Sequence, residues 1–255
     1  MTADPADETA AVLIHAWKAL MDAHPDAWME ISDGLAACVT GIPSAGLNGI
    51  WSSRRDPDAD ELRRLLGEMK NRGVPHLLEL RPGTNEAALA VAAESDLVPA
   101  DDMPLMRLDD PGELERARAA APALAIRELG PDEAALHARV AAAGFGENPD
   151  HFIRLLPPVV MEVEGFRAYV GEVHGEVVTT AVGVTVGDCV GVFNVATPAA
   201  HRRHGYGAAI TAHVVEDGFA NDASWAWLQS SPSGYAVYEA LGFRTLERWL
   251  TWLRV

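Results

Sequence analysis

The sequence predicts an α/β (α+β) fold of two domains, each built on a mixed, mostly antiparallel central sheet flanked by helices. Three observations lead to this fold class. Apolar residues recur at helical spacing in segments such as 58–72, whereas 166–173 and 177–185 alternate or run apolar, as strands do. His174-Gly175, between these two strands, is a hairpin signal. Helix and strand signals follow one another along all 255 residues, and that order predicts a sheet covered by helices.

The first predicted domain covers residues 1–110. Its opening helix, 8–22, has Asp7 or Thr9 as its predicted cap. A second helix, 58–72, is stopped by Gly73. The other predicted elements are a helix over 85–95 and strands over 28–34, 35–42, 48–51, 76–80 and 104–108.

A boundary follows at Asp109-Asp-Pro-Gly112, and residues 111–122 form a charged, alanine-rich predicted linker. The second predicted domain is therefore 123–255. Its expected elements are helices over 131–143 and 151–156, the hairpin strands, strands over 189–197 and 224–229, and a closing pair of strands over 243–249 and 251–255.

The composition excludes several classes of function. Hydrophobic residues make up 49% and charged residues 22% of the chain, as in soluble globular proteins. The formal net charge is −17, which argues against a nucleic-acid partner because no basic face is available to replace counterions. An anionic ligand would have to be held by a local cluster of positive groups.

Membrane insertion, export and metal binding are also not expected. The acidic N-terminus is unlike a signal peptide, and no apolar run approaches the roughly 20 residues that span a bilayer. Cys38 and Cys189 stand far apart in apolar stretches, and no Cys/His spacing indicates zinc. Two buried thiols fit a reducing compartment, so we expect a cytoplasmic protein without a metal.

One stretch stands out from this acidic background. The apolar segment 190–196 leads into Arg202-x-x-Gly205-x-Gly207, and a helix follows at once. The two glycines allow a close backbone approach, and the first amides of a helix attract anions. His201, Arg203 and His204 add positive or chargeable groups. The pattern is typical of a phosphate site, although the motif alone is a weak signal.

A second motif makes the interpretation more specific. Ser224-Trp-Ala-Trp-Leu-Gln229 is an apolar run, and Tyr238-Glu-Ala-Leu-Gly-Phe243 follows it. Together with Arg202–Gly207, these residues resemble the acyl-CoA-binding core of the GNAT N-acetyltransferase superfamily, in its tandem two-domain form. The resemblance covers residues 124–255. The first domain resembles the family in element order only. Arg81-Pro-Gly-Thr84 follows its strand 76–80, where the family would have an Arg-x-x-Gly-x-Gly loop, so this domain is predicted to be degenerate and unable to bind the pyrophosphate.

The resemblance implies acetyl-CoA as the acyl donor. The cofactor would lie between two parallel strands, 190–197 and 224–229. Main-chain groups at the end of the first strand would hold the pantetheine arm and polarise the thioester, and the loop amides would hold the pyrophosphate. The implied cofactor-binding residues are Val195, Ala196, Thr197, Arg202, Arg203, His204, Gly205, Tyr206, Gly207, Ala208 and Ser231. The family often has an asparagine near Ser231, and the serine leaves that contact open.

The resemblance also makes Tyr238 the general acid for the departing thiolate. The alternative is a core tyrosine on a helix face, with Tyr235 as the substitute acid. Asn194 is expected to orient a water or the substrate, but the strand 190–196 has no carboxylate to serve as a base. Glu162 and Glu164 are candidates by position only, and the favoured interpretation of each is a solvated surface carboxylate. Trp225 and Trp227 alternate along one strand and are expected in the core.

We therefore expect an acetyl-CoA-dependent N-acetyltransferase that acts on the primary amine of a small molecule by direct attack on the thioester. It would be a monomer or a homodimer. The alternative is a non-catalytic acyl-CoA-binding or regulatory module that keeps the loop and lacks the base. A Rossmann-type nucleotide site is a poor third candidate, because the Gly-x-Gly-x-x-Gly spacing is absent.

Overall fold

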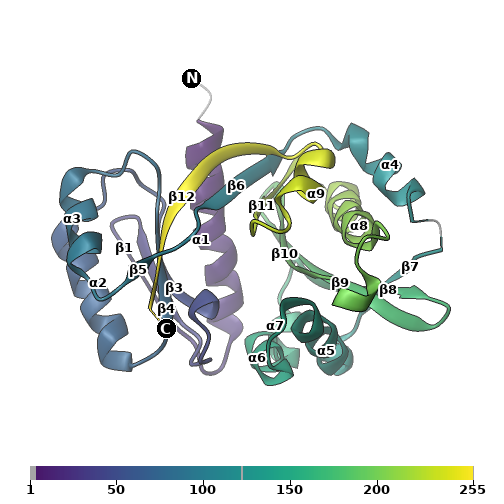
Figure 1. Ribbon diagram of the computed structural model, residues 1–255, viewed down its shortest axis with the longest axis horizontal. Helices are drawn as coiled ribbons and strands as arrows, with labels where there is room; N and C mark the ends of the chain where they lie inside the picture. Colours follow the sequence, from purple (N-terminus) through teal and green to yellow (C-terminus); the bar gives the residue numbers. More distant parts are fainter. Residues whose placement is uncertain (1–3, 122, 255) are drawn as a thin grey trace. The chain divides into compact units, whose positions relative to one another are not determined.

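The computed structural model describes residues 4–121 and 123–254, which divide into two compact units (Figure 1). The N-terminal unit comprises Met1–Leu105 together with Thr245–Val255, and the C-terminal unit comprises Met106–Arg244. This division differs from the predicted boundaries, since the last strand of the chain belongs to the first unit. Pro122, at the end of the predicted linker, lies outside the described residues.

The N-terminal unit is a mixed sheet in the order β1-β2-β3-β4-β12, with the short β5 also paired to β12. All of these pairings are antiparallel except that between β3 and β4. Its elements are α1 (Pro5–Ala23), β1 (Trp28–Ser32), β2 (Leu35–Val39), β3 (Asn48–Ser52), α2 (Ala59–Arg72), β4 (His76–Leu80), α3 (Glu86–Glu94), β5 (Val98–Pro99), most of β12 (Arg244–Arg254) and the start of β6 (Met103–Leu108).

The helices of this unit begin at side-chain caps that the sequence supplies. The side chains of Asp58 and Asn85 accept hydrogen bonds from main-chain amides in the first turns of α2 and α3. The predicted caps of the first helix, Asp7 and Thr9, are wrong. Asp4 caps α1, and Pro5 stands at its first position, where a missing N–H costs nothing.

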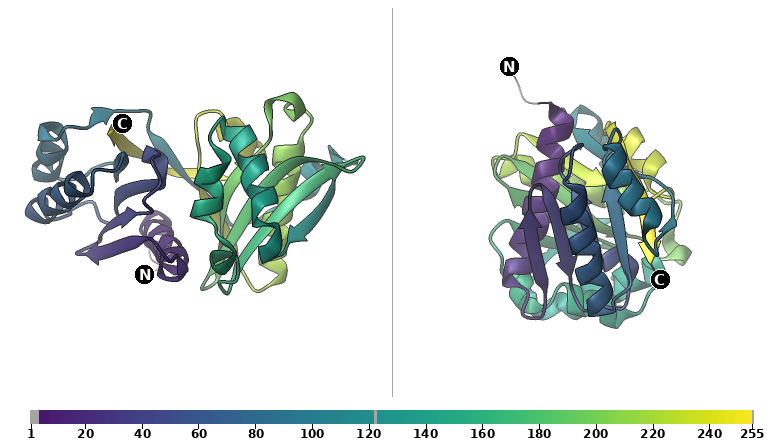
Figure 2. Two further views of the ribbon diagram at one scale, coloured as in Figure 1. Left: turned by 90° about the horizontal axis from the view of Figure 1, so that it is seen from below. Right: turned by 90° about the vertical axis from the view of Figure 1, so that its left-hand side faces the viewer.

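The two faces of this sheet are covered by different helices. α2 and α3 supply Leu62, Leu65 and Val91 to a core against one face. On the opposite face Trp17 of α1 stacks on Trp51 of β3, with ring centroids 5.3 Å apart. The right-hand view of Figure 2 shows α1, α2 and α3 running alongside the strands.

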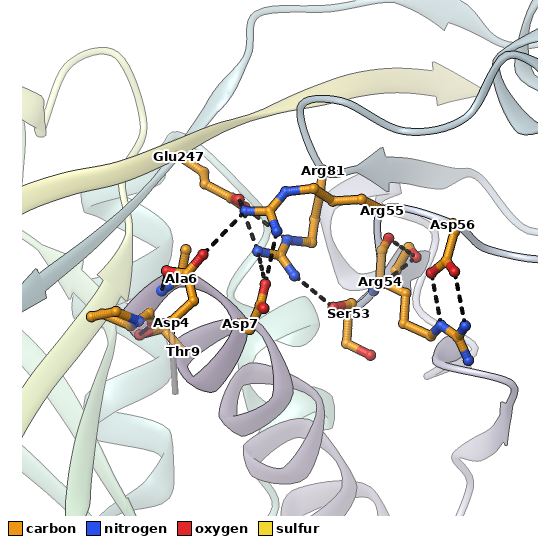
Figure 3. A network of polar contacts seen from close by, with 12 residues as sticks. Asp4, Ala6, Asp7, Thr9, Ser53, Arg54, Arg55, Asp56, Arg81 and Glu247 are labelled. Atoms are coloured by element: carbon orange, nitrogen blue, oxygen red, sulfur yellow. Dashed lines mark hydrogen bonds and ion pairs between the residues drawn. The ribbon is translucent and has the colours of Figure 1, made fainter. Parts of the chain in front are cut away.

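The closing strand differs from its prediction. Instead of two strands, one continuous strand β12 pairs with β4 from Leu250↔Leu80 to Arg254↔His76. A network of charged groups accompanies it (Figure 3). The Arg81 guanidinium, 1% exposed, donates from Nε and Nη2 to the two carboxylate oxygens of Glu247, each at 2.8 Å. Asp7 and Arg55 join the same network.

The C-terminal unit has the sheet order β11-β10-β9-β8-β7, antiparallel except between β10 and β11. The predicted hairpin is β8 and β9. The elements are α4 (Leu114–Ala119), β7 (Ala125–Leu129), α5 (Ala134–Phe145), α6 (Pro149–Leu155), α7 (Pro158–Met161), β8 (Phe166–Val173), β9 (Glu176–Val186), β10 (Cys189–Ala196), α8 (Tyr206–Ala220), β11 (Trp225–Gln229) and α9 (Tyr235–Ala240).

Helices cover this second sheet as well. Ile210 and Val214 of α8 pack with Val190 and Val192 in one core, while α5 and α6 form a second cluster with Ala196. The segment predicted as a linker contains α4, whose Leu114 is fully buried in the α8 core. The predicted fold class, mixed and mostly antiparallel sheets flanked by helices, is therefore confirmed.

Candidate active site

The candidate site lies where two parallel strands part. β10 and β11 are in register over three residue pairs, from Cys189↔Trp225 to Gly191↔Trp227. Beyond this point β10 continues to Ala196 and β11 to Gln229, and the two strands no longer pair with each other. At the last pair Trp227 lies over Gly191, where an added Cβ would come within 2.7 Å of the indole. Its indole N–H is buried and has no hydrogen-bond partner among the described residues. The parted ends leave main-chain groups of β10 available to a ligand.

A β-bulge stands beside this opening. β10 and β9 pair through Phe193↔Val182 and then shift register before Ala196↔Thr180. Asn194, inside the bulge, has φ +48, a conformation that asparagine tolerates better than most residues. Such bulges redirect main-chain and side-chain groups next to sites. Asn194 and Val195 are both half-buried.

Residues 197–207, which we call the glycine loop, join β10 to α8. Arg203 has φ +69 and Gly205 has φ +81, so the chain turns sharply twice just before the helix. Among the described residues, the amides from Arg203 to Ala208 have no hydrogen-bond acceptor, and the first amide of α8 to find one is that of Ala209. Unpaired amides in such turns, at a helix N-terminus, form an anion-binding concavity.

The side chains of this loop point in different directions. Arg202 donates to the main-chain oxygens of Thr197 and Gly144, at 3.1 and 2.7 Å. His204 contacts the main chain of its own loop and stacks on Tyr206, with centroids 5.4 Å apart. His201 Nε2 lies 3.3 Å from Glu176. Arg203 is exposed and, within the described part of the chain, has no partner.

Threonines fix the end of β10 against this loop. The Thr179 hydroxyl donates to the Ala196 oxygen at 3.0 Å and lies 3.0 Å from the Thr197 hydroxyl. A Cβ at Gly207 would lie 3.5 Å from Thr197 Oγ1, so the strand end and the first turn of α8 are in contact. The predicted residues of strand end and loop thus come together in one place.

Tyr238 is half-buried on the short helix α9. Its ring meets Phe243 edge-on at 6.1 Å, and its hydroxyl has no hydrogen-bond partner among the described residues. Burial raises the pKa of Tyr238 to about 12, so the phenol is protonated at neutral pH. Ser231 precedes α9, which begins at Tyr235 and has no side-chain cap. The Ser231 hydroxyl accepts a hydrogen bond from the Gly234 amide at 3.3 Å.

Comparison with known proteins identifies this part of the chain. Residues 136–243 match the model of the Acetyltransferase (GNAT) family. The C-terminal unit contains a GNAT domain. No curated protein sequence is significantly similar to the chain.

Solved structures extend the likeness in fold to nearly the whole chain. A GCN5-related N-acetyltransferase from Kribbella flavida aligns with a TM-score of 0.70 at 18% identity, covering 99% of this chain and 96% of that one. A tandem GNAT protein from the clavulanic acid biosynthesis pathway aligns with a TM-score of 0.56 at 15% identity over 99% and 96% of the two chains. A GCN5-related N-acetyltransferase from Sphaerobacter thermophilus gives 0.59 at 15% over 87% and 76%.

The N-terminal unit also has a parallel pair, β3 and β4, which are in register from Gly49↔Leu77 to Trp51↔Glu79 as β10 and β11 are in the other unit. The loop after the first strand of this pair is 53–58. It is this segment, and not Arg81-Pro-Gly-Thr84, that corresponds to the glycine loop. The order of predicted strands points to Arg81–Thr84 instead, because strand order alone does not show which two strands are parallel.

The loop 53–58 of the N-terminal unit makes internal contacts, among them that of Ser53 with Arg81 (Figure 3). The loop 53–58 has no glycine, and the Asp58 side chain accepts an amide of α2 at 2.8 Å, where an anion would bind. Arg81, just after β4, donates to the Ser53 oxygen, just after β3, at 2.8 Å. The loop 53–58 is therefore engaged by internal contacts, whereas the amides of the glycine loop are unpaired among the described residues.

Among the described residues, the two candidate bases, Glu162 and Glu164, make no hydrogen bond or ion pair with the strand ends or the glycine loop. Glu162 and Glu164 are exposed, as their favoured interpretation expects. Sequence reasoning missed His137, which is 1% exposed on α5. Its Nδ1 lies 2.8 Å from the Thr180 hydroxyl, and its Nε2 has no partner among the described residues. Burial lowers the pKa of His137 to about 4, so the imidazole is neutral. No sequence signal marks one histidine within an alanine-rich helix.

This buried imidazole predicts a pH dependence of stability. In the unfolded chain His137 takes up a proton below about pH 6.5, whereas in the folded chain it does so only near pH 4. Stability is therefore full above pH 6.5 and falls as the pH is lowered toward 4, by about 3 kcal/mol. Urea unfolding at pH 7 and pH 5 should show a smaller difference for His137→Gln than for the wild type. Equal differences would contradict the prediction.

Proposed function

We propose that the chain is an acetyl-CoA-dependent N-acetyltransferase that acetylates the primary amine of a small molecule. The observation that carries the proposal is the row of unpaired amides from Arg203 to Ala208, next to the parted strands of a GNAT domain. These amides suit the pyrophosphate of CoA, and the strand end from Val195 to Thr197 suits its pantetheine arm. The residues present therefore fit acetyl-CoA.

The proposed reaction is direct attack of the amine on the thioester carbonyl. The C–N bond forms as the C–S bond breaks, and the thiolate leaves with a proton from Tyr238. Main-chain N–H groups near the bulge polarise the carbonyl oxygen, a contact that is most effective where water is excluded. Asn194 holds the amine or a water that accepts its proton. We include a cytoplasmic location in the proposal, because the buried thiols of Cys38 and Cys189 do not form a disulfide.

A second candidate function is a non-catalytic acyl-CoA-binding or regulatory module. The observation in its favour is that β10, from Cys189 to Ala196, has no carboxylate. Tyr238 argues against it, since a binding module needs no acid. Release of free thiol from acetyl-CoA with a panel of small amines distinguishes the two. Binding without turnover would favour the module.

Among the described residues, none of the helices has both the length and the apolar composition of a membrane-spanning helix.

Gly205→Glu should abolish CoA binding, because it places a bulky anion at the concavity. CoA at 100 times its Kd should stabilise the wild type by about 2.7 kcal/mol in thermal unfolding, and should leave the variant unchanged. NAD is the ligand control. Gly73→Glu is the matched control variant, because Gly73 has φ +67, has open space around it and lies in the other unit. Stabilisation of Gly205→Glu by CoA would exclude the glycine loop as the binding site.

A further inference from the structure

We propose that the two adjacent arginines of the glycine loop have different tasks. Arg202 is a positioning residue that fixes the loop to the end of α5, and Arg203 supplies the charge that meets the bound anion. The inference rests on the proposed function, since the anion is taken to be the pyrophosphate of CoA.

The first step is the geometry of Arg202. Its Nε donates to the Thr197 oxygen at 3.1 Å and its Nη2 to the Gly144 oxygen at 2.7 Å. These two oxygens come from segments far apart in the sequence, the end of β10 and the last turn of α5. A planar guanidinium donates to the two oxygens from two different nitrogens in fixed directions, whereas an ammonium group presents all its donors from one atom on a flexible stem.

The second step is the nature of the acceptors. Gly144 lies in the last turn of α5, where carbonyls have no partner within the helix and a cation is favoured. This end of α5 lies directly against β10, since a Cβ on Gly144 would come within 2.7 Å of the Ala196 Cβ and 3.1 Å of the Thr197 amide. Arg202 therefore fastens the glycine loop to two packed elements.

The third step is the contrast with Arg203. Arg203 has φ +69, which is unfavourable for a residue with a side chain. At this turn the side chains of Arg202 and Arg203 leave the backbone in different directions. Arg203 is exposed and makes no hydrogen bond or ion pair with the described residues. The charge of Arg202 is already engaged by two main-chain dipoles, whereas the charge of Arg203 is available to a ligand.

The test measures the Kd of CoA by calorimetry for the intact chain and four variants, Arg202→Lys, Arg202→Gln, Arg203→Lys and Arg203→Gln. For Arg202 we expect lysine and glutamine to weaken binding alike, by about tenfold or more, because either change breaks the link between the two carbonyls. For Arg203 we expect lysine to bind nearly as the wild type and glutamine to bind more weakly, because charge alone is needed.

A chemical rescue adds an independent measurement. Millimolar guanidinium, too dilute to denature, should restore CoA binding to Arg202→Ala, and methylammonium should not. Ligand-free unfolding midpoints near that of the wild type establish that the variants are folded, as expected for an exposed side chain. Wild-type affinity in Arg202→Lys or Arg202→Gln would overturn the assignment. Failure of the wild type to bind CoA would instead remove the proposed function, and this inference with it.

Discussion

Replacing Glu247 with glutamine is expected to lower the free energy of unfolding by about 3–5 kcal/mol, because it leaves the Arg81 guanidinium buried without its main counterion. Both side chains are almost fully buried, 1% and 4% exposed, and two hydrogen bonds of 2.8 Å join them. The Glu247 carboxylate also accepts the indole N–H of Trp249 at 3.0 Å. Urea unfolding followed by circular dichroism measures the loss.

A double-mutant cycle separates the pair from its surroundings. Arg81→Met with Glu247→Leu should cost less than the sum of the single changes, since two apolar side chains leave no buried charge. Asp22→Asn is the control, because the Lys18–Asp22 pair has side chains 48% and 63% exposed and should contribute less than about 1 kcal/mol. A loss below 1 kcal/mol in Glu247→Gln would show that Asp7 alone neutralises Arg81.

The second large effect is expected in turnover. Tyr238→Phe should reduce kcat by roughly 100-fold to 10,000-fold, the range for loss of a general acid, and should change the Kd of CoA little. The raised pKa of about 12 makes the phenol a weak acid. A thiolate leaving in a site with little water is a correspondingly stronger base. Ionisation of Tyr238 should not limit the rate at any pH below about 10.

Tyr235→Phe is the control, because Tyr235 lies on the same helix and is the substitute acid. Thiol release from acetyl-CoA with an accepted amine measures both variants. If Tyr235→Phe loses turnover while Tyr238→Phe retains it, the roles of the two tyrosines are exchanged. Equal wild-type rates in both variants would remove a tyrosine acid from the mechanism.

Elements with local signals could be predicted closely from the sequence. The predicted strand 76–80 has the bounds of β4, and the predicted helix 58–72 matches α2 to within one residue, since Asp58 is its cap and Gly73 follows its last residue. Each of these signals acts within a few residues of the element it bounds. The glycine loop and Tyr238 were found in the same way, from residues close together in the sequence.

Features that depend on distant residues could not be predicted in this way. α5 continues through Gly144 to Phe145, beyond the predicted end of this helix at residue 143. Gly144 serves close packing against β10, which is a tertiary requirement. The partner of β12, the hydrogen bond of Arg202 to Gly144 and the burial of His137 also depend on contacts across the fold. None of them leaves a pattern in neighbouring residues.

The place of β12 has a consequence for synthesis on the ribosome. The strand that pairs with β4 is translated only after residues 106–244, on the order of ten seconds later than residues 4–105 at 5–20 residues per second. During that interval the nascent sheet has an open edge at β4, a place where other chains can pair. During the same interval Arg81 lacks its main counterion, the carboxylate of Glu247. A ribosome that stops before Glu247 would therefore release a chain whose first half, although fully translated, lacks the strand that completes it.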